Sequence, residues 1–147
     1  MSEPRDTRRP LFHWYVDCAL GKELVVALYT RPCRYGRCAF CALPGLSLGG
    51  EAVSARDIDR QVDHVLGEYT AEQLAVVAKV SIYTASSSLD QECLPTRSLM
   101  YLSLKIADLP SLQMVSLETR PEYVEDWELK ALRAVLGEIG VLPYYTF

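Results

Sequence analysis

The sequence lacks a hydrophobic segment long enough to cross a membrane. Its longest strongly apolar run, residues 24–28, is far shorter than the about 20 residues that a membrane-spanning helix needs. A secretory signal is also missing, because the arginines near the start lead into a short apolar stretch that His13 interrupts and Asp17 follows. We therefore expect a cytoplasmic protein with no membrane partner.

An excess of positive charge is missing as well. The chain has 15 Lys and Arg against 19 Asp and Glu, a net charge of −4, which excludes a surface that is basic throughout but leaves room for a local basic patch. The 147 residues, half of them hydrophobic, are typical of one soluble globular domain. The length is below the roughly 250 residues of a complete eight-unit β/α barrel, so any barrel units form only part of one.

Five cysteines are present, and this odd number argues against a framework of disulfides. Cys33, Cys38 and Cys41 lie within nine residues, in a C-x4-C-x2-C spacing. Three thiolates so close together can turn toward one point, as a metal ion or an iron–sulfur cluster requires. We interpret the triplet as a metal site and not as three small apolar residues in a loop.

The spacing alone leaves three kinds of metal site open. A structural zinc needs four ligands, and the spare candidates Cys18, His64 and Cys93 lack the short pair spacing of a zinc ribbon. A plant-type ferredoxin uses the same spacing with a distant fourth cysteine, which would be Cys93. The third kind is a [4Fe–4S] cluster held by three cysteines, with one iron open to a small molecule.

Hydrophobic patterns along the chain alternate between strands and helices. Continuous apolar runs rich in β-forming residues predict strands at 23–30, 75–84 and 112–118. Apolar stripes at helical spacing predict helices at 54–69, 95–109 and about 126–136, and a fourth strand begins in 137–142. Repeated βα units imply a parallel sheet, so the predicted fold class is α/β.

Polar segments follow each of the three predicted strands. The cysteine triplet comes after the first, a Ser/Thr cluster at 84–88 after the second, and Glu118-Thr-Arg120 after the third. Ligands of parallel β/α folds bind at the carboxyl ends of the strands. We therefore expect these three segments to converge on one site.

These residues resemble the radical S-adenosylmethionine (SAM) superfamily, whose usual signature is C-x3-C-x-aromatic-C after the first strand of a partial β/α barrel. Cys33, Cys38 and Cys41 match it with Phe40 as the aromatic residue, except that the first gap is one residue longer. Segment 116–123 is similar to a strand end in the branch of the Elongator catalytic subunit, and 84–90 to one in archaeosine-synthase-like proteins. The resemblance, which extends to cores of the MiaB-NifB type, covers residues from about 24 to 136.

The resemblance implies a fold and a domain organisation. The fold would be a partial parallel β/α barrel with about three βα units of a TIM-type barrel, the N-terminal half of the family core. Residues 1–20 would be an N-terminal extension and residues 21–147 the partial core domain.

The resemblance also implies two cofactors, a [4Fe–4S] cluster and SAM. An electron passed to the cluster would cleave SAM and give a 5′-deoxyadenosyl radical, so the hard chemistry would belong to the cofactors. The implied cluster ligands are Cys33, Cys38 and Cys41, with Arg31, Arg34 and Arg37 complementing the anionic cluster. The implied SAM-binding residues are Phe40 near the adenine, Thr84, Ser86 and Ser87 on the methionine moiety, Glu118 on an amino or ribose hydroxyl group, and Arg120 nearby.

Simpler explanations exist for the individual SAM-binding residues. Phe40 could pack in the core, residues 86–88 could form a solvated turn, and Glu118 could form a structural ion pair with Arg120. A second function also stays open, that of a non-catalytic zinc or ferredoxin-like iron–sulfur protein with Cys18 or Cys93 as the fourth ligand.

The family core usually has six βα units, and this chain has three. Three explanations compete: a truncated gene product, half of a split enzyme, or a small self-contained cluster protein. We favour the truncated gene product. Half a barrel would expose a strand edge and apolar inner faces, which favours a dimer or a complementing half-barrel. The implied partners are an electron donor of the flavodoxin or ferredoxin type and, by family analogy alone, a tRNA substrate.

Overall fold

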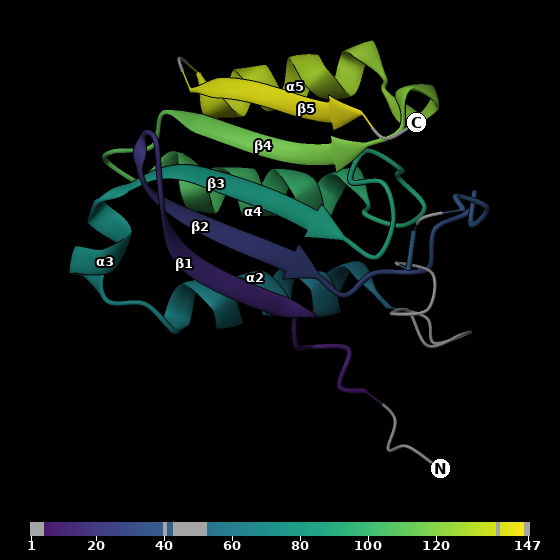
Figure 1. Cartoon of the computed structure of the whole chain (residues 1–147), viewed down its shortest axis with the longest axis horizontal. Coiled ribbons are helices and arrows are strands. Elements are labelled where there is room, and N and C mark those ends of the chain that lie inside the picture. The colour runs from purple at the N-terminus through teal and green to yellow at the C-terminus, as the bar shows by residue number, and fades with distance from the viewer. Residues whose placement is uncertain (1–4, 40, 43–52, 138, 146–147) are drawn as a thin grey trace.

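The computed structural model describes residues 5–39, 41–42, 53–137 and 139–145. They form a five-stranded sheet in the order β1-β2-β3-β4-β5 (Figure 1). Strand β1 is antiparallel to β2, while β2 to β5 are parallel. The elements are β1 (Phe12–Cys18), β2 (Gly21–Leu28), α2 (Ala55–Gly67), α3 (Ala71–Ala75), β3 (Val77–Thr84), α4 (Thr96–Ala107), β4 (Met114–Thr119), η1 (Pro121–Tyr123), α5 (Asp126–Leu136) and β5 (Gly140–Tyr145).

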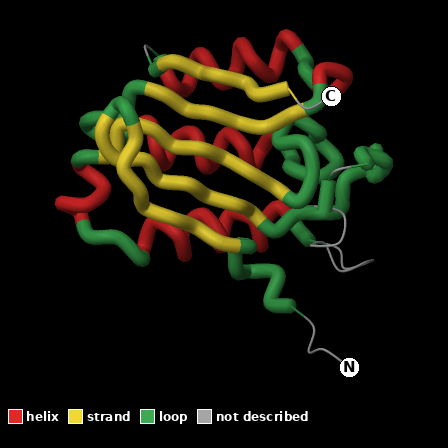
Figure 2. The backbone as a smooth tube through the Cα atoms, in the orientation of Figure 1, coloured by secondary structure: helices red, strands yellow, loops and turns green. Residues whose placement is uncertain are grey.

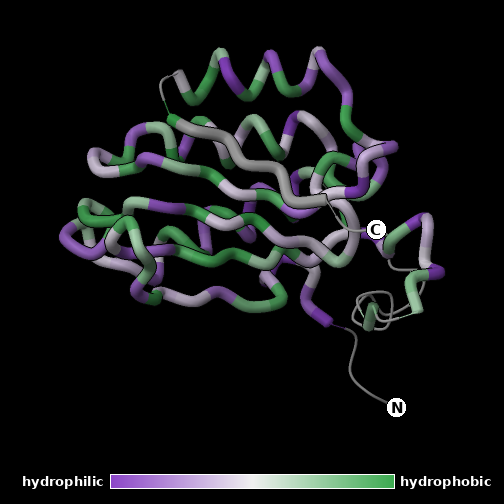
Figure 3. Tube along the Cα trace, turned by 45° about the horizontal axis from the view of Figure 1, so that its top comes forward, coloured by the Kyte–Doolittle hydropathy of each residue, from purple (hydrophilic) through white to green (hydrophobic). Residues whose placement is uncertain are grey.

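The hydrophobic core lies between the sheet and the helices α2, α4 and α5, which all cover the same face (Figure 1). Alternate residues of a strand point to the same face of the sheet. In the central strands, the side chains that face the helices are almost fully buried. Figure 3 shows how hydrophobic and hydrophilic residues alternate along α5. The core-facing residues include Leu24, Val26 and Leu28 of β2, Val80 and Ile82 of β3, and Val115 and Leu117 of β4.

The predicted α/β class is confirmed, and the fold is a partial parallel β/α barrel. The predicted strands are β2, β3, β4 and β5, and the predicted helices are α2, α4 and α5. Strand β1 and the short helix α3 were not predicted. No helix in the described part of the chain has the length and apolar character that crossing a membrane requires.

Strand β1 escaped prediction because it lies at the edge of the sheet and is only partly buried. Its side chains alternate between exposed and half-buried, with His13 and Tyr15 on the half-buried side. The His13 ring bonds the Tyr69 hydroxyl at 2.6 Å, and the Tyr15 hydroxyl donates to the Gln73 carbonyl at 2.9 Å. The strand is thus held by its pairing with β2 and by these polar contacts, and not by an apolar run. The division into residues 1–20 and 21–147 stays a prediction.

The face of the sheet opposite the helices is more polar than the sequence suggested. On that face Lys79 Nζ lies 3.3 Å from Glu23 Oε1, and the Ser81 hydroxyl donates to the same carboxylate. The two charged side chains are only 18% and 14% exposed. The expectation of an apolar inner face is therefore wrong at Glu23, Lys79 and Ser81, where an ion pair links β2 to β3.

Gln61 of α2 ties this helix to the carboxyl end of β2. Its side chain is fully buried. Gln61 Oε1 accepts from the Tyr29 N–H at 2.8 Å, and Nε2 donates to the carbonyls of Tyr29 at 2.9 Å and Thr7 at 2.6 Å. Tyr29 comes directly after β2, so this amide satisfies backbone groups just before the cysteine loop begins.

We expect Gln61→Ala to lower the free energy of unfolding by about 2–4 kcal/mol, because it leaves the buried N–H and C=O of Tyr29 without partners. Urea denaturation under reducing conditions measures this loss. Gln113→Ala is the matched control, since Gln113 is exposed, and we expect it to change stability by at most about 0.5 kcal/mol. Equal effects of the two substitutions would contradict the role of Gln61.

Candidate functional site

Three loops meet at the carboxyl edge of the parallel sheet, on the same side of the molecule (Figure 2). The first follows β2 and carries the cysteine triplet, the second joins β3 to α4, and the third contains η1 and joins β4 to α5. The Ser88 N–H donates to the Glu118 carbonyl at 2.8 Å, which links the second loop to the end of β4. The structure thus brings together the segments that the sequence placed after each strand.

Each thiol of the cysteine triplet is free and half-buried. The Cys41 N–H donates to the Cys38 carbonyl at 3.2 Å, so these two residues share one turn. Gly36 has φ +58°, and a Cβ there would lie 3.4 Å from the Cys33 carbonyl oxygen, so a glycine suits this bend. Among the described residues no three His, Cys, Asp or Glu side chains are arranged to hold a metal ion, and convergence of the three sulfurs stays a prediction.

Two other candidates of the sequence analysis have different outcomes in the structure. Phe40, the expected adenine-packing residue, lies outside the described residues. Cys18 pairs with Gly21 at the amino end of β2, whereas the triplet follows the carboxyl end. Since a strand rises about 3.3 Å per residue, the length of β2 keeps Cys18 away, and its proposal as a fourth ligand is wrong.

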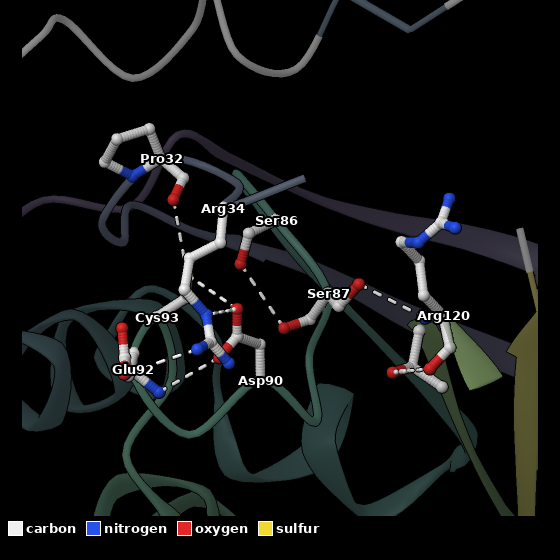
Figure 4. A network of polar contacts seen from close by, with 9 residues as sticks. Pro32, Arg34, Ser86, Ser87, Asp90, Glu92, Cys93 and Arg120 are labelled. Carbon is white, nitrogen blue, oxygen red and sulfur yellow. Dashed lines mark hydrogen bonds and ion pairs between the residues drawn. The ribbon is translucent and has the colours of Figure 1, made fainter. Parts of the chain in front are cut away.

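Arg34 of the cysteine loop is clamped by Asp90 of the second loop (Figure 4). Its Nε and a terminal nitrogen donate to the two Asp90 oxygens at 2.8 and 2.5 Å, and the carboxylate is 1% exposed. Glu92 lies 3.3 Å from the guanidinium, which also stands 5.0 Å from the Tyr123 ring centroid. Asp90 was not among the predicted site residues, because nothing in one sequence pairs residues 56 positions apart.

Cys93 lies beside this clamp and close to the start of the triplet. Its buried thiol is 3.3 Å from both the Pro32 carbonyl and an Asp90 oxygen (Figure 4). Burial is the main reason that the pKa of this thiol rises to about 11, so the thiol is protonated at neutral pH. A metal ligand must be a thiolate, and Cys93 would have to give up these contacts to become one.

The hydroxyl residues after β3 are buried, which contradicts the solvated turn considered as their simpler explanation. Thr84, Ser86 and Ser87 are at most 4% exposed. Thr84 Oγ1 donates to the Ser86 carbonyl at 2.7 Å, and Ser86 Oγ donates to the Ser87 carbonyl at 3.3 Å. Ser87 Oγ accepts from the Arg120 N–H at 3.2 Å (Figure 4). These hydroxyls shape the second loop, and their bonds to SAM stay a prediction.

Arg120 and Glu118 stand at the end of β4 but do not form the ion pair considered for them. Arg120 Nε lies 2.5 Å from Glu122 Oε1, and a terminal nitrogen lies 3.5 Å from Cys38 Sγ. The guanidinium carbon is 3.7 Å from the Tyr35 ring centroid. Glu118 is half-buried, and burial raises the pKa of its carboxyl.

A cavity of about 350 Å³ opens between the second and third loops, a volume in the range of small-molecule sites. Arg34 is the one basic residue in the described lining of this cavity, which also contains three glutamates. This cavity was not predicted, because its wall comes from loops that are separated along the chain. Its lining residues are Arg34, Leu89, Gln91, Glu92, Glu122, Tyr123 and Glu125.

Comparison with known proteins supports the fold. No protein-family model matches the chain. It is 29% identical to an uncharacterized protein of Methanocaldococcus jannaschii, over 93% of this chain and 40% of that protein. Queuine lyase from Clostridium spiroforme, solved bound to SAM and queuine, is similar in structure with a TM-score of 0.61 at 21% identity, over 89% of this chain and 50% of that one. The chain thus spans half or less of each protein that it matches.

We expect Asp90→Ala to lower the free energy of unfolding by about 2–3 kcal/mol, because it removes the carboxylate that holds Arg34, the Glu92 N–H and the Cys93 thiol. Glu92→Ala is the matched control, since this partner of Arg34 is 66% exposed, and we expect it to cost at most about 1 kcal/mol. Denaturant titration of both variants with reductant present checks this. A loss in Asp90→Ala no larger than in Glu92→Ala would refute the anchoring role.

Glu118→Gln tests the buried carboxyl at the end of β4. Burial raises the pKa of this carboxyl in the folded protein, so ionising Glu118 costs the folded state stability. Below the pKa of an unfolded glutamate, about 4.3, the carboxyl is protonated in both states and this cost is absent. As the pH rises through the folded pKa the carboxyl ionises, and the stability of the wild type falls relative to that of the variant. We expect the variant to be the more stable protein at pH 7 and equal to wild type near pH 4, as urea midpoints across this range would show.

Glu122→Gln is the control of opposite sign for this pH dependence. The hydrogen bond from Arg120 lowers the pKa of Glu122, so its stabilising effect is present above the unfolded pKa and is lost as the pH falls. The variant should therefore be slightly less stable than wild type at pH 7, since the side chain is 45% exposed. Destabilisation by Glu118→Gln at pH 7 would contradict the assignment.

Proposed function

We propose that this chain is a radical SAM-type protein in which Cys33, Cys38 and Cys41 hold a [4Fe–4S] cluster and the adjoining loops bind SAM. When bound, the reduced cluster and SAM would supply a 5′-deoxyadenosyl radical. The chain's own residues would bind and orient these cofactors and exclude water from them. Thr84, Ser86, Ser87, Glu118 and Arg120 are the proposed residues of the SAM side of the site, together with Phe40.

The position of the cysteine loop carries this proposal. The loop lies directly beyond the carboxyl end of the first strand of the parallel sheet and contacts the loops after β3 and β4. Ligands of parallel β/α folds bind at this edge. The fold also resembles that of an enzyme solved with SAM bound. Three free, half-buried thiols on one loop are the donor set that an iron–sulfur cluster requires.

The proposal extends to the partners. A low-potential one-electron donor of the flavodoxin or ferredoxin type would reduce the cluster. Strand β5 is the other edge of the described sheet, and we propose that further polypeptide, in the same chain or in a partner, covers this edge. The substrate then meets residues contributed by that further polypeptide.

A second candidate function is a non-catalytic iron–sulfur or zinc protein with Cys93 as the fourth ligand. The contact of the Cys93 thiol with the Pro32 carbonyl favours it, because this contact places Cys93 beside Cys33. Its protonated, buried state disfavours it. The two functions differ in the number of cysteines that they need.

Anaerobic reconstitution with iron and sulfide separates the two functions. For the radical SAM function, the dithionite-reduced protein should give a [4Fe–4S] EPR signal that changes when SAM is added, and 5′-deoxyadenosine should form. Alanine at Cys33, Cys38 or Cys41 should reduce bound iron at least about tenfold, because each thiolate is a cluster ligand. An EPR signal indifferent to SAM would sink the proposal.

Cys18→Ala and Cys93→Ala are the controls for this experiment. Cys18 lies at the opposite end of the sheet, so its variant should keep wild-type iron. The radical SAM function predicts that folded Cys93→Ala, checked by circular dichroism, also keeps its cluster. Loss of iron from this folded variant would favour the four-ligand protein instead.

A further inference from the structure

The side chain of Arg120 reaches from the third loop to the cysteine loop. Its backbone N–H is held by Ser87 Oγ at 3.2 Å, directly after β4. A terminal guanidinium nitrogen then lies 3.5 Å from Cys38 Sγ, within reach of a hydrogen bond to sulfur. The side chain is only 15% exposed, so water competes little for this contact.

Two neighbours fix the plane of the Arg120 guanidinium. Glu122 accepts from Nε at 2.5 Å, and the Tyr35 ring lies against the face of the guanidinium at 3.7 Å from its carbon. Only arginine can bond a carboxylate through one edge, stack on a ring and still aim a second donor at sulfur. This arrangement is specific to arginine, which a lysine would not reproduce.

The other arginine at this edge has a different task. Arg34 spends both of its aligned donors on the buried Asp90 carboxylate, with Glu92 beside it. Its charge is therefore compensated by these carboxylates, and it anchors the loop. Arg120 instead presents a donor to a cysteine of the triplet.

We propose that Arg120 is a positioning residue that acts through Cys38 and raises the reduction potential of the cluster. This inference rests on the proposed function. Reduction adds one electron from a low-potential donor and neither breaks nor makes a bond, and it takes a three-thiolate cluster from one net negative charge to two. A hydrogen bond to a ligand sulfur stabilises the more negative state. Arg120 therefore favours the reduced form.

A potentiometric titration followed by EPR tests this on the reconstituted protein. At the wild-type midpoint, we expect Arg120→Gln to lower the ratio of reduced to oxidised cluster about tenfold, which equals 59 mV for a one-electron couple. Arg120→Lys keeps the positive charge but loses the planar guanidinium with its several N–H donors. Its ratio of reduced to oxidised cluster should therefore lie between those of Arg120→Gln and wild type. Arg56→Gln, at an exposed arginine of α2, is the control for loss of one positive charge and should match wild type.

The outcomes separate this inference from the proposed function. Equal midpoints of wild type and Arg120→Gln at equal iron content would overturn the role of Arg120 and leave the proposed function intact. Absence of a cluster in the wild type would overturn both. If Arg120→Gln does not retain iron, Tyr35→Leu decides, since it removes the ring that orients the guanidinium and should shift the ratio in the same direction. A wild-type midpoint in Tyr35→Leu and Arg120→Lys would then refute the inference.

Discussion

The ion pair between Arg34 and Asp90 is the interaction on which the functional edge depends. A carboxylate that is 1% exposed is costly to bury unless a cation and hydrogen bonds compensate it. Arg34 supplies the cation through two aligned bonds, and the Glu92 N–H and the Cys93 thiol supply further donors. Because Arg34 follows Cys33 directly, the burial of Asp90 fixes where the cysteine loop starts. The geometry of one loop is thus set by the solvation of a residue in another.

The rest of the fold explains why this edge needs such contacts. The helices and strands are held by a core of aliphatic side chains, and burial of apolar area is not directional. That core fixes the sheet but not the loops that leave it. Directional bonds take over where the strands end, first from Gln61 to the backbone of Tyr29 and then from Arg34 to Asp90. The open face of the sheet follows the same rule, since Glu23 and Lys79 form an ion pair where none of the described helices covers them.

The sequence was sufficient to predict the elements that bury an apolar face. Strand β3 has a continuous apolar run and helix α4 an apolar stripe at helical spacing, and both formed where these patterns predicted them. Strand β1 has no such pattern, because it is an edge strand paired with β2, and the side-chain contacts of His13 and Tyr15 are polar and join residues more than 50 positions apart. Asp90 escaped for the same reason. The expectation for Arg34 also changed, from a free cation near the cysteines to the partner of a buried carboxylate, because the sequence does not reveal how a charge is compensated.

The pairing of Arg34 and Arg120 with carboxylates also determines how the carboxyl edge of the sheet can interact with the cysteine sulfurs. The sequence suggested a diffuse positive field from several arginines, but Arg34 and Arg120 are each paired with a carboxylate within 2.5 Å. Two such pairs have little net charge, and their field falls off quickly with distance and is screened further by salt at the surface. What remains at short range is the direction of each N–H bond. A glycine at position 36, with φ +58°, lets the chain between Cys33 and Cys38 bend, and so brings Cys38 to the donor of Arg120 while Arg34 holds the start of the loop. The segment between Cys33 and Cys38 is therefore shaped by a bend and two arginine contacts, one that anchors the loop and one that reaches sulfur.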